Sequence, residues 1–341
     1  MSEKSIQQQL LEAPLPEERK KKLSSIFSGE SLPSICYDVI AKHVFSPDLH
    51  PERMDFILQH TMKDPSFMVD KSASNEIYLQ NFYSKKTITD IPAWLKDHRL
   101  ADLGIQREAQ EYIFNRADIY ASNMLLLQYS VEAGQPKSEI DYANVDGSII
   151  IVLMANSPEL FRNHDSNRYI HRIIKARSDS GLEFPMIKQM AFVQLDKALE
   201  LYLNDSYNED EDIELLKLFA FIADINNDKV IKETVQNQLL DDIREDVISF
   251  TRDKEVQQMI LAEDLAIMDW NSNMKLAHQK GHAEGHAEGI AEGAAEKHAE
   301  GLKALVQNLK PFLHDKEHVL EAIKKSEGFE TTTLEMVEQY W

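Results

Sequence analysis

The chain has little cysteine and an uneven balance of charge. Its single cysteine, Cys36, excludes an internal disulfide and a zinc site built from cysteines. Lysine and arginine total 37 against 58 aspartate and glutamate residues, which gives a net charge of −21. This acidity disfavours tight, sequence-independent binding of nucleic acid through bulk electrostatics. Any contact with DNA must come from a locally basic surface.

Long hydrophobic runs are also missing. The longest uninterrupted run covers residues 149–155, far below the ~20 residues that a membrane-spanning helix needs. The first residues carry charges and glutamines where a signal peptide needs a continuous apolar stretch. We therefore expect no membrane span and a cytoplasmic protein.

Enough apolar sequence is present for a core, because 43% of the 341 residues are hydrophobic. Residues 1–33 are polar and punctuated by prolines, which predicts a weakly ordered arm. Residues 34–203 are expected to form an α/β core. Within it, residues 148–154 are apolar without alternation, which is typical of a strand buried on both faces. Residues 109–133 keep helical spacing and predict a long core helix.

The second half of the chain lacks strand patterns and is expected to be helical. Residues 204–280 form one helical region, residues 281–301 carry a Gly-x-Ala-Glu repeat, and residues 302–341 form a C-terminal helical segment. Glycine costs about 1 kcal/mol relative to alanine in a helix, so the repeat helix needs compensation. Close approach of a second copy would supply it and make a homo-oligomer. A frayed, charged linker is the alternative.

A hairpin near residue 97 brings polar residues together. With its turn centred on Asp97, Asp90 lies seven residues before the turn and Gly104 seven after it, so the two should face each other across the strands. Gln106 lies two residues further on and points to the same face. Paired carboxylates with a nearby amide are what a divalent-metal phosphodiesterase needs. A solvent-facing strand carboxylate is the plainer interpretation of Asp90 alone.

Several motifs in the same order and spacing resemble the recombination-promoting nuclease and transposase family, within the PD-(D/E)XK nuclease superfamily. The likeness runs from about residue 37 to residue 301. It is carried by Asp38, Lys42 and Phe45 in YDVIAKHVF, Asp90 in TITDI, Gln106 in LGIQ, Arg116, Tyr120 and Ser122 on the following helix, FVQLDK at residues 192–197, and the segment 259–281 that leads into the repeats.

The resemblance implies an α/β fold with a mixed sheet flanked by helices. It also implies a Mg²⁺-dependent DNA endonuclease of the kind associated with recombination in bacterial mobile elements. Asp90 would be the metal ligand and Gln106 would orient water or phosphate. The alternative is an inactive DNA-binding or assembly protein that oligomerises through its repeat helix.

One departure from the family pattern affects the chemistry. The second metal-binding glutamate of the family is Gly104 here, which has no side-chain oxygen. Asp102 or Glu108 can replace this glutamate if the strand stays regular, because both would lie on the same face of the strand as Gly104. A longer turn would instead make Glu108 and Gln110 the true motif. A site that has lost its activity is the third possibility.

Candidate DNA contacts are the basic residues near these motifs. Residues 162–177 hold five lysines and arginines against one acid, and we select Arg168, Arg172 and Lys175 from them. Lys42 either reaches the phosphate or pairs with Asp38 one helical turn away. Arg116, which the family resemblance also suggests, either faces phosphate or packs on Tyr120. A basic strand surface without a ligand explains the segment equally well.

Overall fold

The computed structural model describes residues 5–73, 76–77, 87–88, 90–128, 146–164, 167–208 and 211–341. The chain divides into two compact units, Met1–Ala266 and Ile267–Trp341. The division falls inside one helix and not near residue 203, where the sequence suggested the end of the core.

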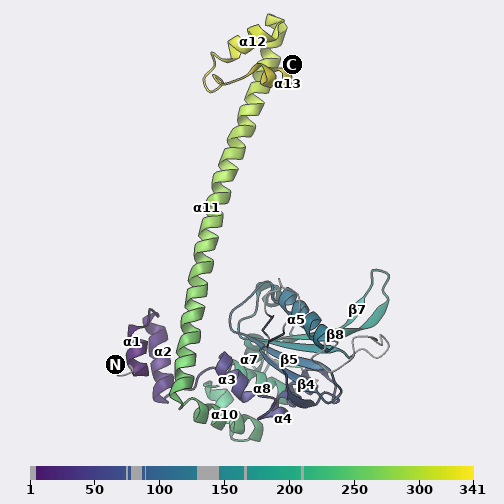
Figure 1. Ribbon diagram of the computed structural model, residues 1–341, viewed down its shortest axis with the longest axis vertical. Helices are drawn as coiled ribbons and strands as arrows, with labels where there is room; N and C mark the ends of the chain where they lie inside the picture. The colour runs from purple at the N-terminus through teal and green to yellow at the C-terminus, as the bar shows by residue number, and fades with distance from the viewer. Residues whose placement is uncertain are drawn as a thin grey trace. The chain divides into compact units, whose positions relative to one another are not determined.

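Helices surround a single large sheet in the first unit (Figure 1). Its helices are α1 (Ile6–Glu12), α2 (Glu17–Ser28), α3 (Asp38–Val44), α4 (Pro51–Met62), α5 (Ile113–Gln128), α6 (Glu159–Arg162), α7 (Leu195–Leu203), α8 (Ile213–Ala223), α9 (Asp228–Thr234), α10 (Gln238–Phe250) and the start of α11 (Lys254–Leu313). Its strands are β1 (Val69–Ser72), β2 (Glu76–Ile77), β3 (Thr87–Ile88), β4 (Ile91–Leu95), β5 (Leu100–Gln106), β6 (Ser148–Met154), β7 (Ile170–Arg177) and β8 (Glu183–Gln194).

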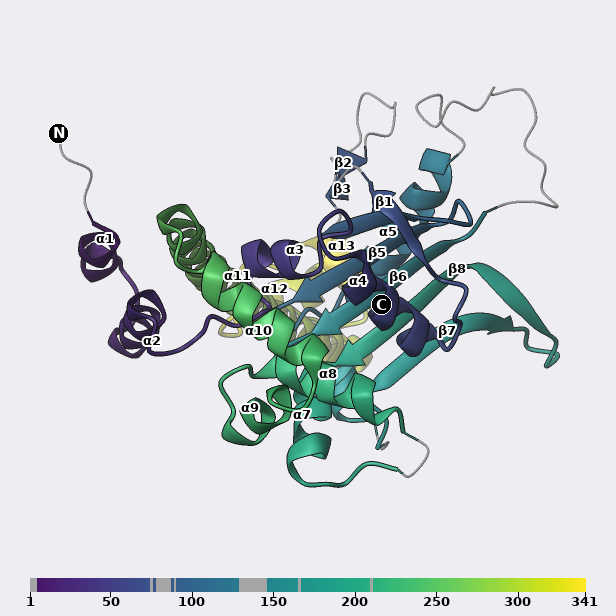
Figure 2. The same cartoon turned by 90° about the horizontal axis from the view of Figure 1, so that it is seen from below.

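The six-stranded sheet is mixed, with the order β1-β4-β5-β6-β8-β7 (Figure 2). The central strands β5, β6 and β8 are parallel, and the outer pairings of β1 with β4, β4 with β5, and β7 with β8 are antiparallel. All seven residues of β6 are buried, which confirms the strand predicted from its continuous apolar run. The α/β class and the mixed sheet flanked by helices are therefore present.

Helices cover both faces of the sheet. Ile150 and Val152 of β6 and Phe192 of β8 form one hydrophobic cluster with Ala117 and Met124 of α5. The other face of β6 is buried as well, because α7 packs against β6 and α8 packs against α7. Successive residues of the central strands therefore point alternately toward α5 and toward the side covered by α7 and α8.

The N-terminal segment is helical where the sequence predicted a weakly ordered arm. Ser5 and Gln8 form a reciprocal capping box at the start of α1. Leu23 and Ile26 of α2 are fully or almost fully buried. The prediction failed because the segment is fixed by contacts with distant parts of the chain, which a local polar composition does not reveal.

A buried ionic network holds α2, α3 and α11 together. Arg19 donates two hydrogen bonds of 2.6 Å to the Asp264 carboxylate, and Arg107 donates one of 3.0 Å to the same group. Arg107 also donates to Glu263 at 2.7 Å, and the Tyr37 hydroxyl donates to Asp264 at 3.1 Å. The first turns of α11 are thereby attached to the N-terminal helices and to the end of β5.

Two further helices, α12 (Lys316–Ile323) and α13 (Leu334–Gln339), pack with the end of α11 in the second unit. Their small core contains Leu302, Val306, Val319, Ile323 and Val337. Residues 269–292 of α11 are exposed at every position. None of the helices in the described parts of the chain is apolar over enough length to cross a membrane.

Two separate helices, α9 and α10, lie within the helical region that the sequence predicts over residues 204–280. Asn237 separates them, because its side chain accepts a hydrogen bond from the Leu240 N–H and caps the second helix. The Gly-x-Ala-Glu segment 281–301 is helical as expected and lies within α11.

Candidate active site

The β4–β5 hairpin has the register expected from its sequence. Ile91 pairs with Leu103 and Pro92 with Asp102, so Asp90 stands opposite Gly104. A Cβ atom added to Gly104 would lie 3.4 Å from Asp90 Oδ2. Asp90 Oδ2 also accepts a hydrogen bond of 2.8 Å from the Ile105 N–H. The longer turn, which would have made Glu108 and Gln110 the motif, is excluded by this register.

Arg116 reaches this hairpin from α5. Its NH1 group donates a hydrogen bond of 3.0 Å to Gln106 Oε1, and its NH2 group lies 3.7 Å from Asp90 Oδ1. Its Nε donates to the Tyr120 hydroxyl at 3.1 Å, one helical turn further along. A guanidinium group therefore bridges the strand acid, the strand amide and the helix.

Asp102 is the second carboxyl group of the site and is 1% exposed. It accepts a hydrogen bond of 3.1 Å from the Ile91 N–H. Burial, followed by the nearby charge of Asp90, raises the pKa of Asp102 to about 8. Burial also raises the pKa of Asp90, against the opposing effects of the Ile105 hydrogen bond and Arg116. Asp102 is therefore mostly protonated at pH 7.

A cavity of about 20 Å³ lies between these residues and α5, enough for about one water molecule. Its lining contains both polar and apolar side chains. The lining residues are Asp90, Asp102, Gly104, Gln106, Ile113, Arg116, Ala117, Tyr120, Ile150 and Val152. The structure thus brings together four residues that the sequence selected: Asp90, Asp102, Gln106 and Arg116.

These residues do not fit a magnesium ion. Mg²⁺ needs several oxygen ligands, and carboxylates bind it best in proteins. Gly104 offers no side-chain oxygen, the buried Asp102 carboxyl group accepts a hydrogen bond from the Ile91 N–H, and the amide oxygen of Gln106 accepts a hydrogen bond from Arg116. Across the described ranges of the chain, no three His, Cys, Asp or Glu side chains are grouped to hold a metal.

Glu108 does not join the site. Glu108 would lie on the same face of the strand as Gly104 only if β5 continued to residue 108. β5 ends at Gln106. The chain bends at residues 107–108, where Arg107 turns toward Tyr37 and Glu263. Glu108 is not part of the cavity lining.

The proposed DNA contacts are spread over several elements. Lys42 forms an ion pair of 2.8 Å with Asp38, which is the interpretation in which Lys42 pairs along its own helix. Lys175 pairs with Glu183 at 3.5 Å on the exposed part of the β7–β8 hairpin, which projects from the sheet (Figure 1). Arg168 and Arg172 line a separate, larger pocket. Arg116 is the one of the five that lines the cavity beside Asp90.

Sequence reasoning missed the residues of the ionic network and of the larger pocket. Arg107 lies one residue beyond the selected strand, and its carboxylate partners, Glu263 and Asp264, are more than 150 positions away. His60 and Asp212 form a hydrogen-bonded pair of 2.6 Å across 152 positions. No local sequence signal distinguishes such residues from ordinary surface charges.

Comparisons of the chain with known protein families, with curated proteins and with solved structures find no match. The candidate site is therefore interpreted from its own geometry.

Proposed function

We propose that the protein binds DNA through a nuclease-like core of the PD-(D/E)XK type that does not hydrolyse phosphodiester bonds. The resemblance of the sequence motifs supports DNA as the partner and a cytoplasmic location. The arrangement of β1, β4 and β5, followed by α5 and the parallel strand β6, is compatible with a core of this type.

The contact of Arg116 with Gln106 and Asp90 carries the proposal. A metal-dependent site at this position would place a metal cation between Asp90 and Gln106. The Arg116 guanidinium provides positive charge there and occupies the amide oxygen of Gln106. With Gly104 in place of a carboxylate, no second acidic side chain stands opposite Asp90 across the two strands.

A plasmid assay tests the absence of hydrolysis. Supercoiled plasmid is incubated with Mg²⁺ and the wild-type protein, and in parallel with the Asp90→Asn variant. Asparagine keeps the oxygen that accepts from Ile105 and removes the charge. We expect the plasmid to stay supercoiled with both proteins. Nicking by the wild type that disappears in Asp90→Asn would show an active nuclease and contradict the proposal.

The Gly104→Glu variant tests whether the site is a lost metal site. The first side-chain atom fits, because its distance from Asp90 Oδ2 is an ordinary van der Waals contact. Nicking that appears with Gly104→Glu and Mg²⁺, and is abolished by adding Asp90→Asn, supports the proposed origin of the site.

DNA binding is measured by fluorescence polarisation with a labelled duplex at low and high salt. Lys42→Gln and Lys175→Gln are expected to weaken binding and to reduce its salt dependence, because each removes one possible phosphate contact. No binding by the wild type at low salt would contradict the proposal.

Self-assembly through α11 is a second candidate function, and one observation favours it. A Cβ added to Gly281, Gly285, Gly289 or Gly293 would meet no atom within 4 Å in the described part of the chain. A helix weakened by four glycines gains stability when another helix packs closely on the small residues.

The molar mass of the full chain, measured by light scattering, tests this second candidate. The Gly285→Glu variant places a bulky charge in the small-residue stripe, and Glu288→Gln is the control on the same exposed helix. A multimer that dissociates in Gly285→Glu and persists in the control supports assembly. A monomeric wild type refutes it.

A further inference from the structure

Three histidines lie on consecutive turns of α11, in the part of the helix that is exposed at every position. They are His278, His282 and His286, which we call the histidine row. Residues four apart lie on the same face of a helix, with about 5–6 Å between their Cβ atoms. His282 therefore has another histidine one turn away on either side.

An ion pair on the same stretch of α11 shows that side chains at this spacing meet. Lys280 Nζ lies 3.8 Å from Glu284 Oε1, which is four residues further along. Two imidazole rings at the same spacing can both reach one metal ion, because a Zn–N bond is about 2.0–2.1 Å long. Paired histidines four residues apart on a helix bind zinc in this way in the metalloprotease motif.

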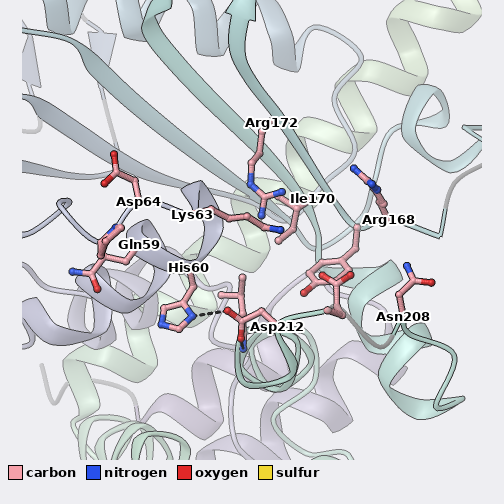
Figure 3. Close-up of a pocket in the computed structure, with 13 residues that line it drawn as sticks. Gln59, His60, Lys63, Asp64, Arg168, Ile170, Arg172, Asn208 and Asp212 are labelled. Carbon is pink, nitrogen blue, oxygen red and sulfur yellow. Dashed lines mark hydrogen bonds and ion pairs between the residues drawn. The ribbon is translucent and has the colours of Figure 1, made fainter. Parts of the chain in front are cut away.

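The nitrogen atoms of the histidine row have no hydrogen bond or ion pair with the described residues. Histidines elsewhere in the chain are engaged. The His60 ring is hydrogen-bonded to Asp212 at 2.6 Å (Figure 3), and the His298 ring to the Gly328 carbonyl at 3.0 Å. The ring nitrogens of the histidine row are therefore available to a ligand from solution.

The histidine row is not simply a product of the Gly-x-Ala-Glu repeat. His278 precedes the repeat, which begins at Gly281. The position after the glycine holds histidine in the first two units of the repeat, and Ile290 and Ala294 in the next two. The repeat therefore accommodates other side chains at this position, and the histidines are confined to consecutive turns.

The charge around the histidine row suits a cation. The repeat contributes one lysine, Lys297, against the glutamates Glu284, Glu288, Glu292, Glu296 and Glu300. Acidic side chains raise the local concentration of cations. Glu284 lies two residues from both His282 and His286, a spacing at which helical side chains do not face each other. The glutamates therefore attract a metal ion, while the imidazole rings supply the ligands.

We propose that the histidine row binds one divalent transition-metal ion, such as Zn²⁺, through two adjacent histidines, with water as the remaining ligands. Imidazole suits Zn²⁺, Ni²⁺ and Cu²⁺, whereas Mg²⁺ prefers oxygen ligands. A two-histidine site agrees with the absence of a three-ligand group of His, Cys, Asp or Glu among the described residues. This inference does not depend on DNA binding by the core or on self-assembly.

His282 belongs to both possible pairs, one with His278 and the other with His286. The two outer histidines are eight residues apart, which is about 12 Å along the helix axis, so one ion cannot bind them both. Each pair encloses one glycine, Gly281 or Gly285, which disfavours the helix. Because the pair forms only in the helical conformation, a bound metal stabilises these turns.

Isothermal titration calorimetry of the full chain with Zn²⁺ tests the proposal. We expect one Zn²⁺ per chain at this site, because both pairs need His282. His282→Gln removes both pairs and should weaken binding about tenfold or more. His278→Gln and His286→Gln each leave one pair and should weaken binding only about twofold. Glu284→Gln, on the same exposed helix, is the control and should have less effect than His282→Gln.

A second measurement follows the helix itself. Circular dichroism during heating should show that Zn²⁺ stabilises helix in the wild type and has no such effect in His282→Gln. Equal weakening of Zn²⁺ binding by the three histidine variants would overturn the pairing. Failure of Zn²⁺ to bind, equally strong binding of Mg²⁺, or an equal loss in Glu284→Gln and His282→Gln would overturn the site.

Discussion

The guanidinium carbon of Arg107 lies 4.0 Å from the centre of the Tyr37 ring. This contact stacks a cation from the end of β5 on an aromatic residue at the start of α3, inside the network that ends at Asp264. The network therefore joins the candidate site strand to the helices around it.

Loss of the Asp264 charge should destabilise the first unit strongly. Asp264→Asn leaves Arg19 and Arg107 without their shared carboxylate in a buried site, which typically costs about 3–5 kcal/mol. Urea unfolding measures the change. The Lys42→Gln variant, which breaks an exposed ion pair with Asp38, is the control and should change the free energy by less than about 1 kcal/mol. A similar loss in both variants would contradict the importance of the network.

The same network predicts acid sensitivity. Burial alone would raise the pKa of Asp264, but its hydrogen bonds and ion pairs with Arg19 and Arg107 outweigh burial and hold the pKa below its ordinary value. Its stabilising contribution is complete above the unfolded-state pKa of about 3.9 and is lost as the pH falls through the lower folded-state pKa. Acid titration followed by circular dichroism should show that Asp264→Asn lacks this part of the transition.

Asp102 predicts the opposite dependence on pH. Its folded-state pKa of about 8 lies above the unfolded value, so the folded state binds the extra proton between these two pKa values. The free energy of unfolding therefore decreases as pH rises from 5 to 8, by up to about 1.4 kcal/mol per pH unit from this group. Asp102→Asn keeps an acceptor for Ile91 and should remove that slope. Identical slopes in both proteins would show that Asp102 is charged in the fold.

Two glycines of the first unit, the buried Gly104 and the half-buried Gly147, should respond differently to substitution by alanine. A Cβ on Gly104 would make ordinary contacts with Asp90 Oδ2 and Ile151 O, so Gly104→Ala should stabilise the strand by about 0.5–1 kcal/mol. A Cβ on Gly147 would lie 2.6 Å from the Ile187 carbonyl oxygen, which requires the backbone to move. We expect Gly147→Ala to destabilise the protein by about 1–3 kcal/mol in urea unfolding. The reverse order of the two variants would contradict the local geometry.

The hairpin and the central strand could be predicted because their determinants are local. The turn at Asp97 fixes the pairing of Asp90 with Gly104, and the apolar run at residues 148–154 fixes a strand buried on both faces. The hairpin also placed Asp102 and Gln106 on the face of Asp90. The chemistry at the cavity then depends on Arg116, whose pairing with Gln106 needs the packing of α5 on the sheet.

Features held by distant residues could not be predicted in this way. The N-terminal helices depend on Arg19 meeting Asp264 across 245 positions. The hydrogen bond from Arg172 of β7 to the Thr61 carbonyl of α4 likewise joins residues that are 111 positions apart. Glu108 failed as a candidate for a different reason, because β5 ends two residues before it and strand parity no longer applies.

Arg116 has one consequence that a dissociable ion would not have. A guanidinium attached to α5 cannot diffuse away, and its charge does not vary over the physiological pH range. The contacts of Arg116 with Asp90 and Gln106 are therefore independent of the divalent cation concentration around the protein. Chelating agents should leave the hairpin and its cavity unchanged.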